Sequence, residues 1–427
     1  AACAAFVQAT TAQARAEAER RLLAFRAGPD PLPVSVALLE LGRSPQAQFH
    51  GGLMTLRERA HGQWPALDAS ARDMLQLRLL QLIAGGAAGV AGYVMREAAH
   101  VAALLAKLAL LDAATAADAA SMFNSDAAGG GHGGGGAGLG SLLGRVSELI
   151  ASADTSHAIV GVHILESTVL EFGSPSSGAT GGGLRWAEHA LARRVFGRDF
   201  LLPAFYTALR ALERIRSQLS PPPFGTPAGS ARLGMSLPSS MANLVNNCAS
   251  VLGLMLSWDF DSGPAADADA ADGETRPGLN ATVVRPPAEA GDWPALLSRT
   301  ELLSCAVEVY AAAARGGPAF SHARHELRQL LIMLASVSHR VSGGDGGGRY
   351  PEYSACVLSA AAALLSAHPL FLAAAGGAAD AAGPLGPLGV SASSENPADV
   401  AEEHGCSLLD GSSMLQRLVM AGGMELL

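Results

Sequence analysis

Hydrophobic residues recur at helical spacing along most of the chain, whereas strand-like alternation of apolar and polar residues is almost absent. Residues 67–84 show the pattern well, because Leu75, Leu79 and Ile83 follow one another at intervals of four. Side chains three or four positions apart share one face of a helix, so this spacing indicates a helix with one apolar face. The pattern predicts an all-α protein.

The predicted helices fall into successive pairs, separated by glycine, proline or polar segments. The first helices of the early pairs begin about 40–45 residues apart, which is typical of HEAT and armadillo repeats. One pair cannot bury its apolar face alone, so the pairs are expected to stack into a HEAT-like superhelix, or α-solenoid. An irregular all-helical domain is the alternative. The predicted pairs are 5–27 with 31–42, 45–64 with 67–84, 90–111 with 139–152, 154–172 with 186–219, 239–258 with 292–315, and 321–342 with 350–367.

Low-complexity segments interrupt this array and suggest the domain boundaries. Residues 1–372 are predicted to form about six repeats, 373–407 a linker rich in Ala, Gly, Pro and Ser, and 408–427 the truncated start of a further repeat. Glycine- or aspartate-rich inserts are expected to be loops within the array, since lengthening a loop costs little additional entropy. The sequence begins without methionine and ends inside a predicted helix, so a fragment of a longer protein is expected.

Composition and charge narrow the function. The 427 residues include 29 Lys and Arg against 38 Asp and Glu, a net charge of −9, which argues against a protein that coats nucleic acid. The five cysteines include no CxxC pair, and the sequence shows no secretory signal peptide with a charged region followed by an apolar one. Both features favour a protein of a reducing compartment. The most apolar window, 353–379, is mostly alanine and is interrupted by His368-Pro369, so a packed repeat helix is favoured there over membrane insertion.

No pattern of catalytic or metal-binding residues is found. The glycine tracts lack the Lys-Ser/Thr of a phosphate-binding loop, and the sequence contains no GxSxG nucleophile turn and no zinc-spaced Cys/His cluster. The sequence therefore predicts no catalytic residues, no cofactor and no metal site. An enzyme with a helical active-site domain remains an alternative, which a deep pocket with several perturbed titratable groups would favour.

Several segments resemble a known family in the same order along the chain. The most distinctive is an apolar helix from residue 241 that closes on Leu256-Ser-Trp-Asp-Phe260. Together with the segments named below, this helix resembles the amino-terminal repeats of exportin 4-type nuclear export receptors, which belong to the importin-β (karyopherin) superfamily. The exportin 7 type is the nearest alternative within that superfamily. The glycine- and aspartate-rich inserts and the heavy use of alanine depart from the family pattern. The further matching segments are Leu23-Ala-Phe-Arg26, Leu38-Leu39-Glu40, Gln48-Phe49, Tyr93-Val-Met-Arg-Glu97, Trp293 and Leu296-Leu297.

The resemblance implies a transport receptor that shuttles between nucleus and cytoplasm. Such receptors bind Ran-GTP through the inner helices of their amino-terminal repeats and contact Phe-Gly nucleoporins at the pore. They also enclose protein cargo, and the cargo associated with the exportin 4 type includes the hypusine-bearing translation factor 5A and Smad-type proteins. A helical-repeat scaffold that binds proteins without Ran dependence is the alternative.

Polar residues on the second helices of the first two pairs are the candidates for Ran contact: Glu40, Arg72, Asp73 and Gln76. Asp73 and Gln76 lie three residues apart and therefore share a helix face. An acidic group there would suit a basic patch on Ran. The alternative for each residue is a solvated outer face.

Overall fold

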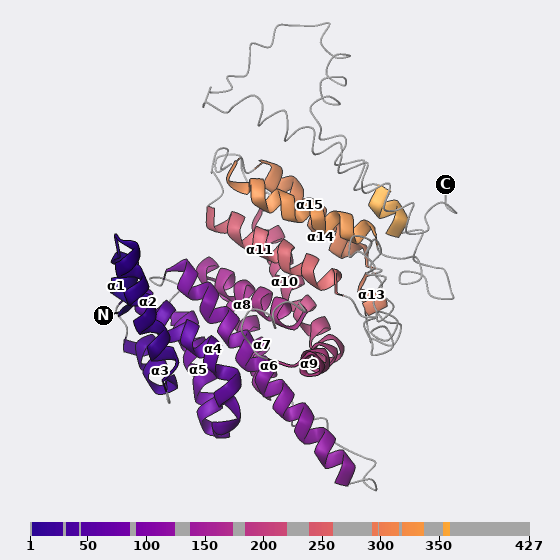
Figure 1. Cartoon of the computed structure of the whole chain (residues 1–427). Coiled ribbons are helices and arrows are strands. Elements are labelled where there is room, and N and C mark those ends of the chain that lie inside the picture. The colour runs from indigo at the N-terminus through magenta and orange to yellow at the C-terminus, as the bar shows by residue number, and fades with distance from the viewer. Residues whose placement is uncertain are drawn as a thin grey trace, which may run out of the picture. The chain divides into compact units, whose positions relative to one another are not determined.

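The computed structural model describes residues 2–28, 31–41, 44–85, 91–123, 137–173, 184–219, 239–258, 293–297, 299–315, 318–336 and 353–358 (Figure 1). These segments are helical and contain no strand, which confirms the all-α prediction for the described part of the chain. The predicted linker at 373–407, the predicted repeat start at 408–427 and the glycine- and aspartate-rich inserts lie outside the described residues.

The helices follow the predicted order, with differences at their ends. The predicted helix 5–27 is divided, because the Thr11 hydroxyl accepts a hydrogen bond from the Ala14 amide and so caps a new helix. The predicted helix 186–219 is likewise two helices, with a break at Phe200. The α-helices are α1 (Ala2–Gln8), α2 (Ala12–Arg26), α3 (Leu32–Leu41), α4 (Met54–Gln63), α5 (Ala69–Gly85), α6 (Gly92–Phe123), α7 (Ala137–Ala151), α8 (Thr155–Gly173), α9 (Trp186–Asp199), α10 (Leu201–Leu219), α11 (Ser239–Leu256), α13 (Trp293–Leu297), α14 (Thr300–Arg315) and α15 (Ser321–Ala335).

The chain divides into two compact units. The first comprises Ala1–Ala211 with Pro238–Met255, and the second comprises Leu212–Leu237 with Leu256–Leu427. In the second unit, α14 packs against α15, and a short helix at 353–358 follows. The hydroxyl of Tyr353 donates a 2.6 Å hydrogen bond to the carbonyl of Leu334, which ties that short helix to the end of α15.

The long helix α6 forms the core of the first unit. It contacts α4, α5, α7, α8 and α9, and its residues from Val101 to Ala106 are all buried. The segment Gly92–Thr115 is also the one described helix long and apolar enough to cross a membrane, with a mean hydropathy of 1.5. Helices at the centre of a packed domain have the same composition, and 67% of this apolar window is buried within the structure. Most of the apolar window predicted from the sequence at 353–379 lies outside the described residues.

Alternate helices of the first unit contact one another. α3 packs against α5 and α5 against α7, while α4 packs against α6 and α6 against α8. Consecutive helices, such as α5 with α6 and α7 with α8, also pack together. The second helices of the first three predicted pairs therefore adjoin one another in chain order, and so do the first helices of the second, third and fourth pairs.

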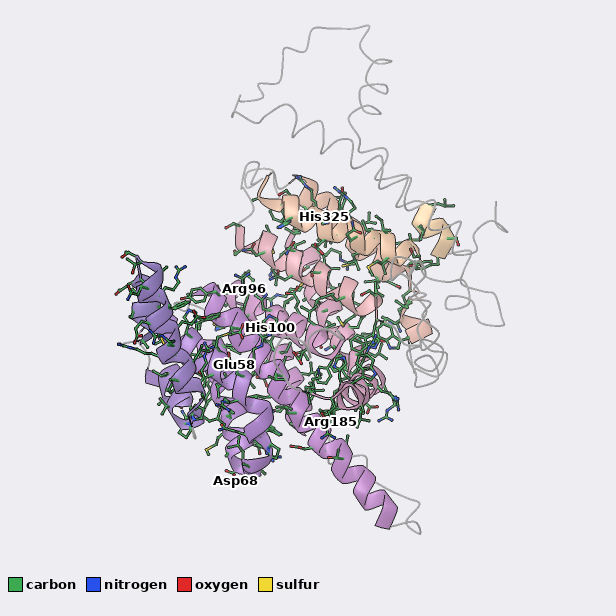
Figure 2. The ribbon with its side chains drawn as sticks, in the orientation of Figure 1. Glu58, Asp68, Arg96, His100, Arg185 and His325 are labelled. Carbon is green, nitrogen blue, oxygen red and sulfur yellow. The ribbon has the colours of Figure 1, made fainter. Side chains whose placement is uncertain are left out.

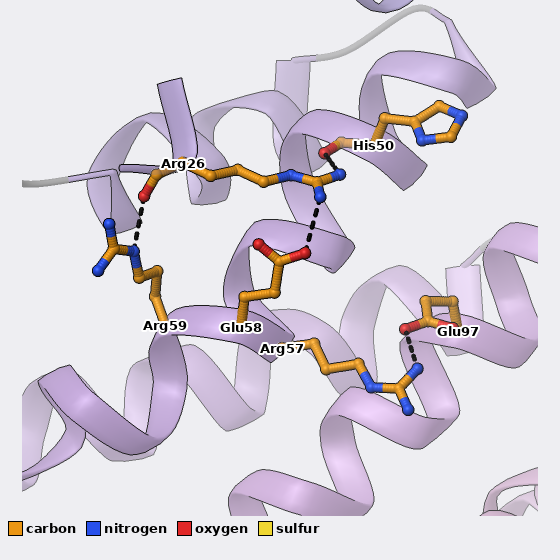
Figure 3. A network of polar contacts seen from close by, with 6 residues as sticks. All are labelled: Arg26, His50, Arg57, Glu58, Arg59 and Glu97. Carbon is orange, nitrogen blue, oxygen red and sulfur yellow. Dashed lines mark hydrogen bonds and ion pairs between the residues drawn. The ribbon is translucent and has the colours of Figure 1, made fainter. Parts of the chain in front are cut away.

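Arginine side chains fasten the end of α2 to its neighbours (Figure 3). Arg26 forms a 2.7 Å ion pair with Glu58 of α4 and donates a hydrogen bond to the backbone carbonyl of His50. Its own carbonyl, at the α2 terminus, accepts a 2.6 Å hydrogen bond from Nε of Arg59. Carbonyls at a helix end have no partner within the helix, so Arg59 satisfies one of them.

A π-helical segment, η1 (Ala47–Leu53), precedes α4 and packs closely on α3. A β-carbon at residue 51 would lie 2.7 Å from Cδ1 of Leu38, and one at residue 52 would lie 2.6 Å from Cδ2 of Leu39. Both distances are well below the normal separation of carbon atoms, about 3.5–4.0 Å. Glycine at these two positions permits the close approach of α3 and η1.

Replacing Gly52 with alanine is expected to destabilise the first unit by about 1–3 kcal/mol, the usual cost of overpacking a core. Leu39, which must move, is only 6% exposed and has little free space. The matched control is Gly62→Ala on α4, where a new β-carbon meets nothing within 4 Å. Urea unfolding followed by circular dichroism should show a lower midpoint for Gly52→Ala and an unchanged or slightly higher one for Gly62→Ala. Equal midpoints would contradict the close packing of η1 on α3.

Candidate protein-binding site

Helix α5 carries three of the four predicted site residues. Its N-terminus is capped by Asp68, which Figure 2 labels: the Oδ1 atom accepts a 2.7 Å hydrogen bond from the amide of Ala71. Leu75, Leu79 and Ile83 form the buried face, as their spacing predicted. Asp73 and Leu77 are consequently turned toward solvent.

A pocket of about 340 Å³ lies where α5, α6 and α7 meet. Asp73 and Gln76, two of the predicted site residues, both contribute to its wall. The pocket combines three polar side chains with an otherwise apolar surface, as is usual for binding sites. Its lining comprises Asp73, Gln76, Leu77 and Leu80 of α5, Ala102 and Ala106 of α6, and Gly138, Ser141 and Leu142 of α7.

Gln76 lies against the start of α7. A β-carbon at Gly138 would come within 3.3 Å of its Oε1 atom and 3.1 Å of the β-carbon of Ala109. Glycine at position 138 thus lets α7 approach both α5 and α6. The Nε2 atom of Gln76 is buried and has no hydrogen-bond partner among the described residues.

The rim of the pocket is partly apolar and exposed. Leu77, which lines it, is 54% exposed, and Met74 on the same helix is 55% exposed. Single exposed leucines are ordinary, but two large apolar side chains beside a pocket are more typical of a contact surface.

Arg72 is engaged within the chain. Its Nη1 atom forms a 2.6 Å ion pair with Oδ2 of Asp112 on α6, and its Nε atom donates to the carbonyl of Trp64. The guanidinium also lies 5.1 Å from the centre of the Trp64 ring, and the indole nitrogen donates to the same Asp112 oxygen. Arg72 therefore holds the start of α5 against α6.

Glu40, the fourth predicted residue, is exposed at the end of α3. Its Oε1 atom lies 3.2 Å from Nε of Arg78 on α5, and both side chains are more than one third exposed. Ion pairs of this kind contribute about 0–1 kcal/mol, because water and salt screen them. Glu40 therefore remains accessible to a partner, whereas the charge of Arg72 is already neutralised.

A buried polar cluster inside the first unit was not predicted. The ammonium of Lys107 on α6 is completely buried and has three acceptors. It donates to the backbone carbonyl of Glu171 at 2.7 Å, to the Oε1 atom of the same residue at 3.0 Å, and to Nδ1 of His189 at 2.9 Å. The cluster thus joins α6, α8 and α9.

Burial sets the protonation states in this cluster. Burial lowers the pKa of Lys107, and the nearby Glu171 carboxylate partly opposes that shift. Burial also lowers the pKa of His189 to about 4, assisted by the positive charges of Lys107 and Arg193. An ammonium can only donate hydrogen bonds, so His189 must accept through an unprotonated Nδ1 atom and carry its proton on Nε2. The cluster is a structural junction with every ammonium proton satisfied.

The described residues contain no group of three or more His, Cys, Asp or Glu side chains placed to hold a metal ion. Trp258, in the most distinctive part of the family resemblance, is 8% exposed and belongs to the core, while Phe260 lies outside the described residues.

No protein-family model matches this sequence, and no curated protein is significantly similar to it.

Proposed function

We propose that the chain is the amino-terminal part of a nuclear transport receptor of the exportin 4 type. In this proposal its helix pairs are HEAT-like repeats stacked into a superhelix. Ran-GTP binds the face formed by α3, α5 and α7, on which α3 and α5 present Glu40, Asp73 and Gln76, while Arg72 holds α5 in position. Protein cargo and Phe-Gly nucleoporins bind other parts of the receptor, which shuttles between nucleus and cytoplasm.

The packing of alternate helices supports the repeat architecture. In stacked helix pairs the first helices adjoin one another, and the second helices do the same. The contacts of α3 with α5 and of α5 with α7 fit one such layer, and those of α4 with α6 and of α6 with α8 fit the other. The ordered resemblance of the sequence to karyopherin repeats supports the same interpretation.

The α5–α7 pocket is the observation that carries the proposal for the binding face. Two residues selected from the sequence, Asp73 and Gln76, lie together in a pocket beside exposed apolar side chains. In a solenoid the second helices line the concave face, and α3, α5 and α7 are the second helices of the first three pairs. A partner bound there would contact several repeats at once.

Binding at several repeats also provides a mechanism for regulated transport. Small rotations between repeats add up to large changes in the pitch of a superhelix. If Ran-GTP and cargo favour the same pitch, each strengthens the binding of the other by an equal factor, because coupling free energies are reciprocal. GTP hydrolysis would take place on Ran, and this chain would supply the binding surface.

A pull-down with immobilised Ran tests the proposal. The intact chain is expected to be retained by Ran loaded with a non-hydrolysable GTP analogue and to be washed off Ran loaded with GDP. Circular dichroism should first confirm that the protein is folded, and a longer version extending beyond Leu427 is the control for contacts outside this segment. Equal retention in both nucleotide states, or none with either version, would favour a protein-binding scaffold without Ran dependence.

The exportin 7 type is the remaining alternative within the superfamily. Both types would bind Ran-GTP, so cargo distinguishes them. Export of hypusine-bearing translation factor 5A that depends on this receptor would favour the exportin 4 type.

A further inference from the structure

The charges around the α5–α7 pocket are unbalanced. On α5 and α7 the arginines are already paired: Arg72 with Asp112, Arg78 with Glu40, and Arg145 with Glu148. Asp73 is the one acidic residue in the pocket lining, and none of the described lysine, arginine or histidine side chains pairs with it. Within the described part of the chain, Asp73 is therefore a carboxylate whose charge is available to a bound molecule.

The surface next to Asp73 is suited to an aliphatic chain. Leu77 and Leu80 follow it along α5, and Leu142 faces the pocket from α7. Leu77 remains 54% exposed, so covering it would remove additional apolar surface from water. The methylene stem of lysine or arginine packs on apolar surface of this kind while its charged end reaches a carboxylate.

We infer that the α5–α7 pocket receives a lysine or arginine side chain of the bound protein together with a neighbouring aliphatic residue. Asp73 pairs with the positive charge, and Leu77, Leu80 and Leu142 pack against the stem and the aliphatic neighbour. The inference rests on the proposed function, because it specifies the chemistry by which Ran-GTP would contact this face. It makes Asp73 and Leu77 the residues that determine affinity at the pocket.

Titration of the intact chain with GTP-loaded Ran tests this inference. Asp73→Asn preserves the shape of the side chain but removes its charge, and we expect Kd to rise 5- to 30-fold. The dependence of Kd on salt concentration should also become shallower, because one charge pair is lost. Leu77→Ser should raise Kd at least 5-fold while leaving the salt dependence unchanged.

Two variants outside the pocket serve as controls. Glu19→Gln removes a carboxylate from the exposed surface of α2, and Leu170→Ser removes a partly exposed leucine (36%) from α8. Both should bind Ran-GTP with the Kd of the unaltered chain, and circular dichroism should show that all four variants are folded.

The outcomes separate this inference from the proposed function. If the unaltered chain binds Ran-GTP and Asp73→Asn binds it equally well, the pocket assignment is wrong and the proposed function stands. The same conclusion follows if the Glu19→Gln control weakens binding as much as Asp73→Asn does. If the unaltered chain fails to bind Ran-GTP, the proposed function falls, and this inference falls with it.

Discussion

Replacing Glu171 with glutamine is expected to destabilise the first unit by about 3–5 kcal/mol. The substitution removes the one carboxylate that pairs with the fully buried ammonium of Lys107 in the described part of the chain, although the carbonyl of residue 171 and Nδ1 of His189 still accept from it. A buried charge without a countercharge is costly, because the protein interior solvates it poorly. Urea unfolding should show a much lower midpoint, and native-state hydrogen exchange should show faster exchange in α6, α8 and α9.

A second substitution distinguishes the loss of a charge partner from general damage to the core. Lys107→Met removes the buried charge with little change in side-chain size, so the double variant Lys107→Met/Glu171→Gln should be more stable than Glu171→Gln alone. The control Glu148→Gln breaks an exposed pair and should alter stability by no more than about 0.5 kcal/mol. A Glu171→Gln protein as stable as Glu148→Gln would contradict the buried junction.

Mild acid is expected to destabilise the same junction through His189. The pKa of this residue is about 4 in the folded protein and about 6.5 when the chain is unfolded. Between these values the unfolded state binds a proton that the folded state does not, so the free energy of unfolding must fall as pH falls from about 6.5 to 4. The expected loss from this residue between pH 7 and pH 5 is about 2 kcal/mol.

Three elements face His189 with charged groups: Lys107 from α6, Glu171 from α8 and Arg193 from its own helix, α9. Protonation would place a second positive charge 2.9 Å from the ammonium of Lys107, which is the physical reason for the expected loss. His189→Asn retains a neutral acceptor near the position of Nδ1 and should reduce the difference in stability between pH 7 and pH 5. Equal pH dependence of the two proteins, measured by urea unfolding at both values, would show that His189 does not govern this acid response.

Helical periodicity predicted the all-α character of the described residues because it reports directly on burial. The buried face of α5 and the positions of the predicted helix pairs follow from spacing alone. Short-range capping was harder to predict, since Thr11 interrupts a sequence that otherwise favours one continuous helix. The π-helical turn of η1 was missed because its cause is tertiary: Gly51 and Gly52 allow contact with leucines more than ten residues earlier in the chain.

Helical periodicity likewise predicted only part of the candidate site, because it reports on single helices and not on contacts between them. The spacing of Asp73 and Gln76 correctly placed them on one face, but it carried no information about the pocket wall supplied by α7. The engagement of Arg72 with Asp112 joins residues 40 positions apart, a distance over which sequence periodicity predicts nothing. Lys107 did leave a signal, as the single charge in the apolar run from Val101 to Leu111, but its partners come from α8 and α9.

Hydrogen–deuterium exchange of the intact chain with and without GTP-loaded Ran tests the central claim most directly. The claim is that the layer formed by α3, α5 and α7 binds the partner. Amides in these three helices should exchange more slowly when Ran-GTP is present and should be unaffected by Ran-GDP. Protection confined to α8 and α11, or no protection by Ran-GTP in any helix, would contradict it.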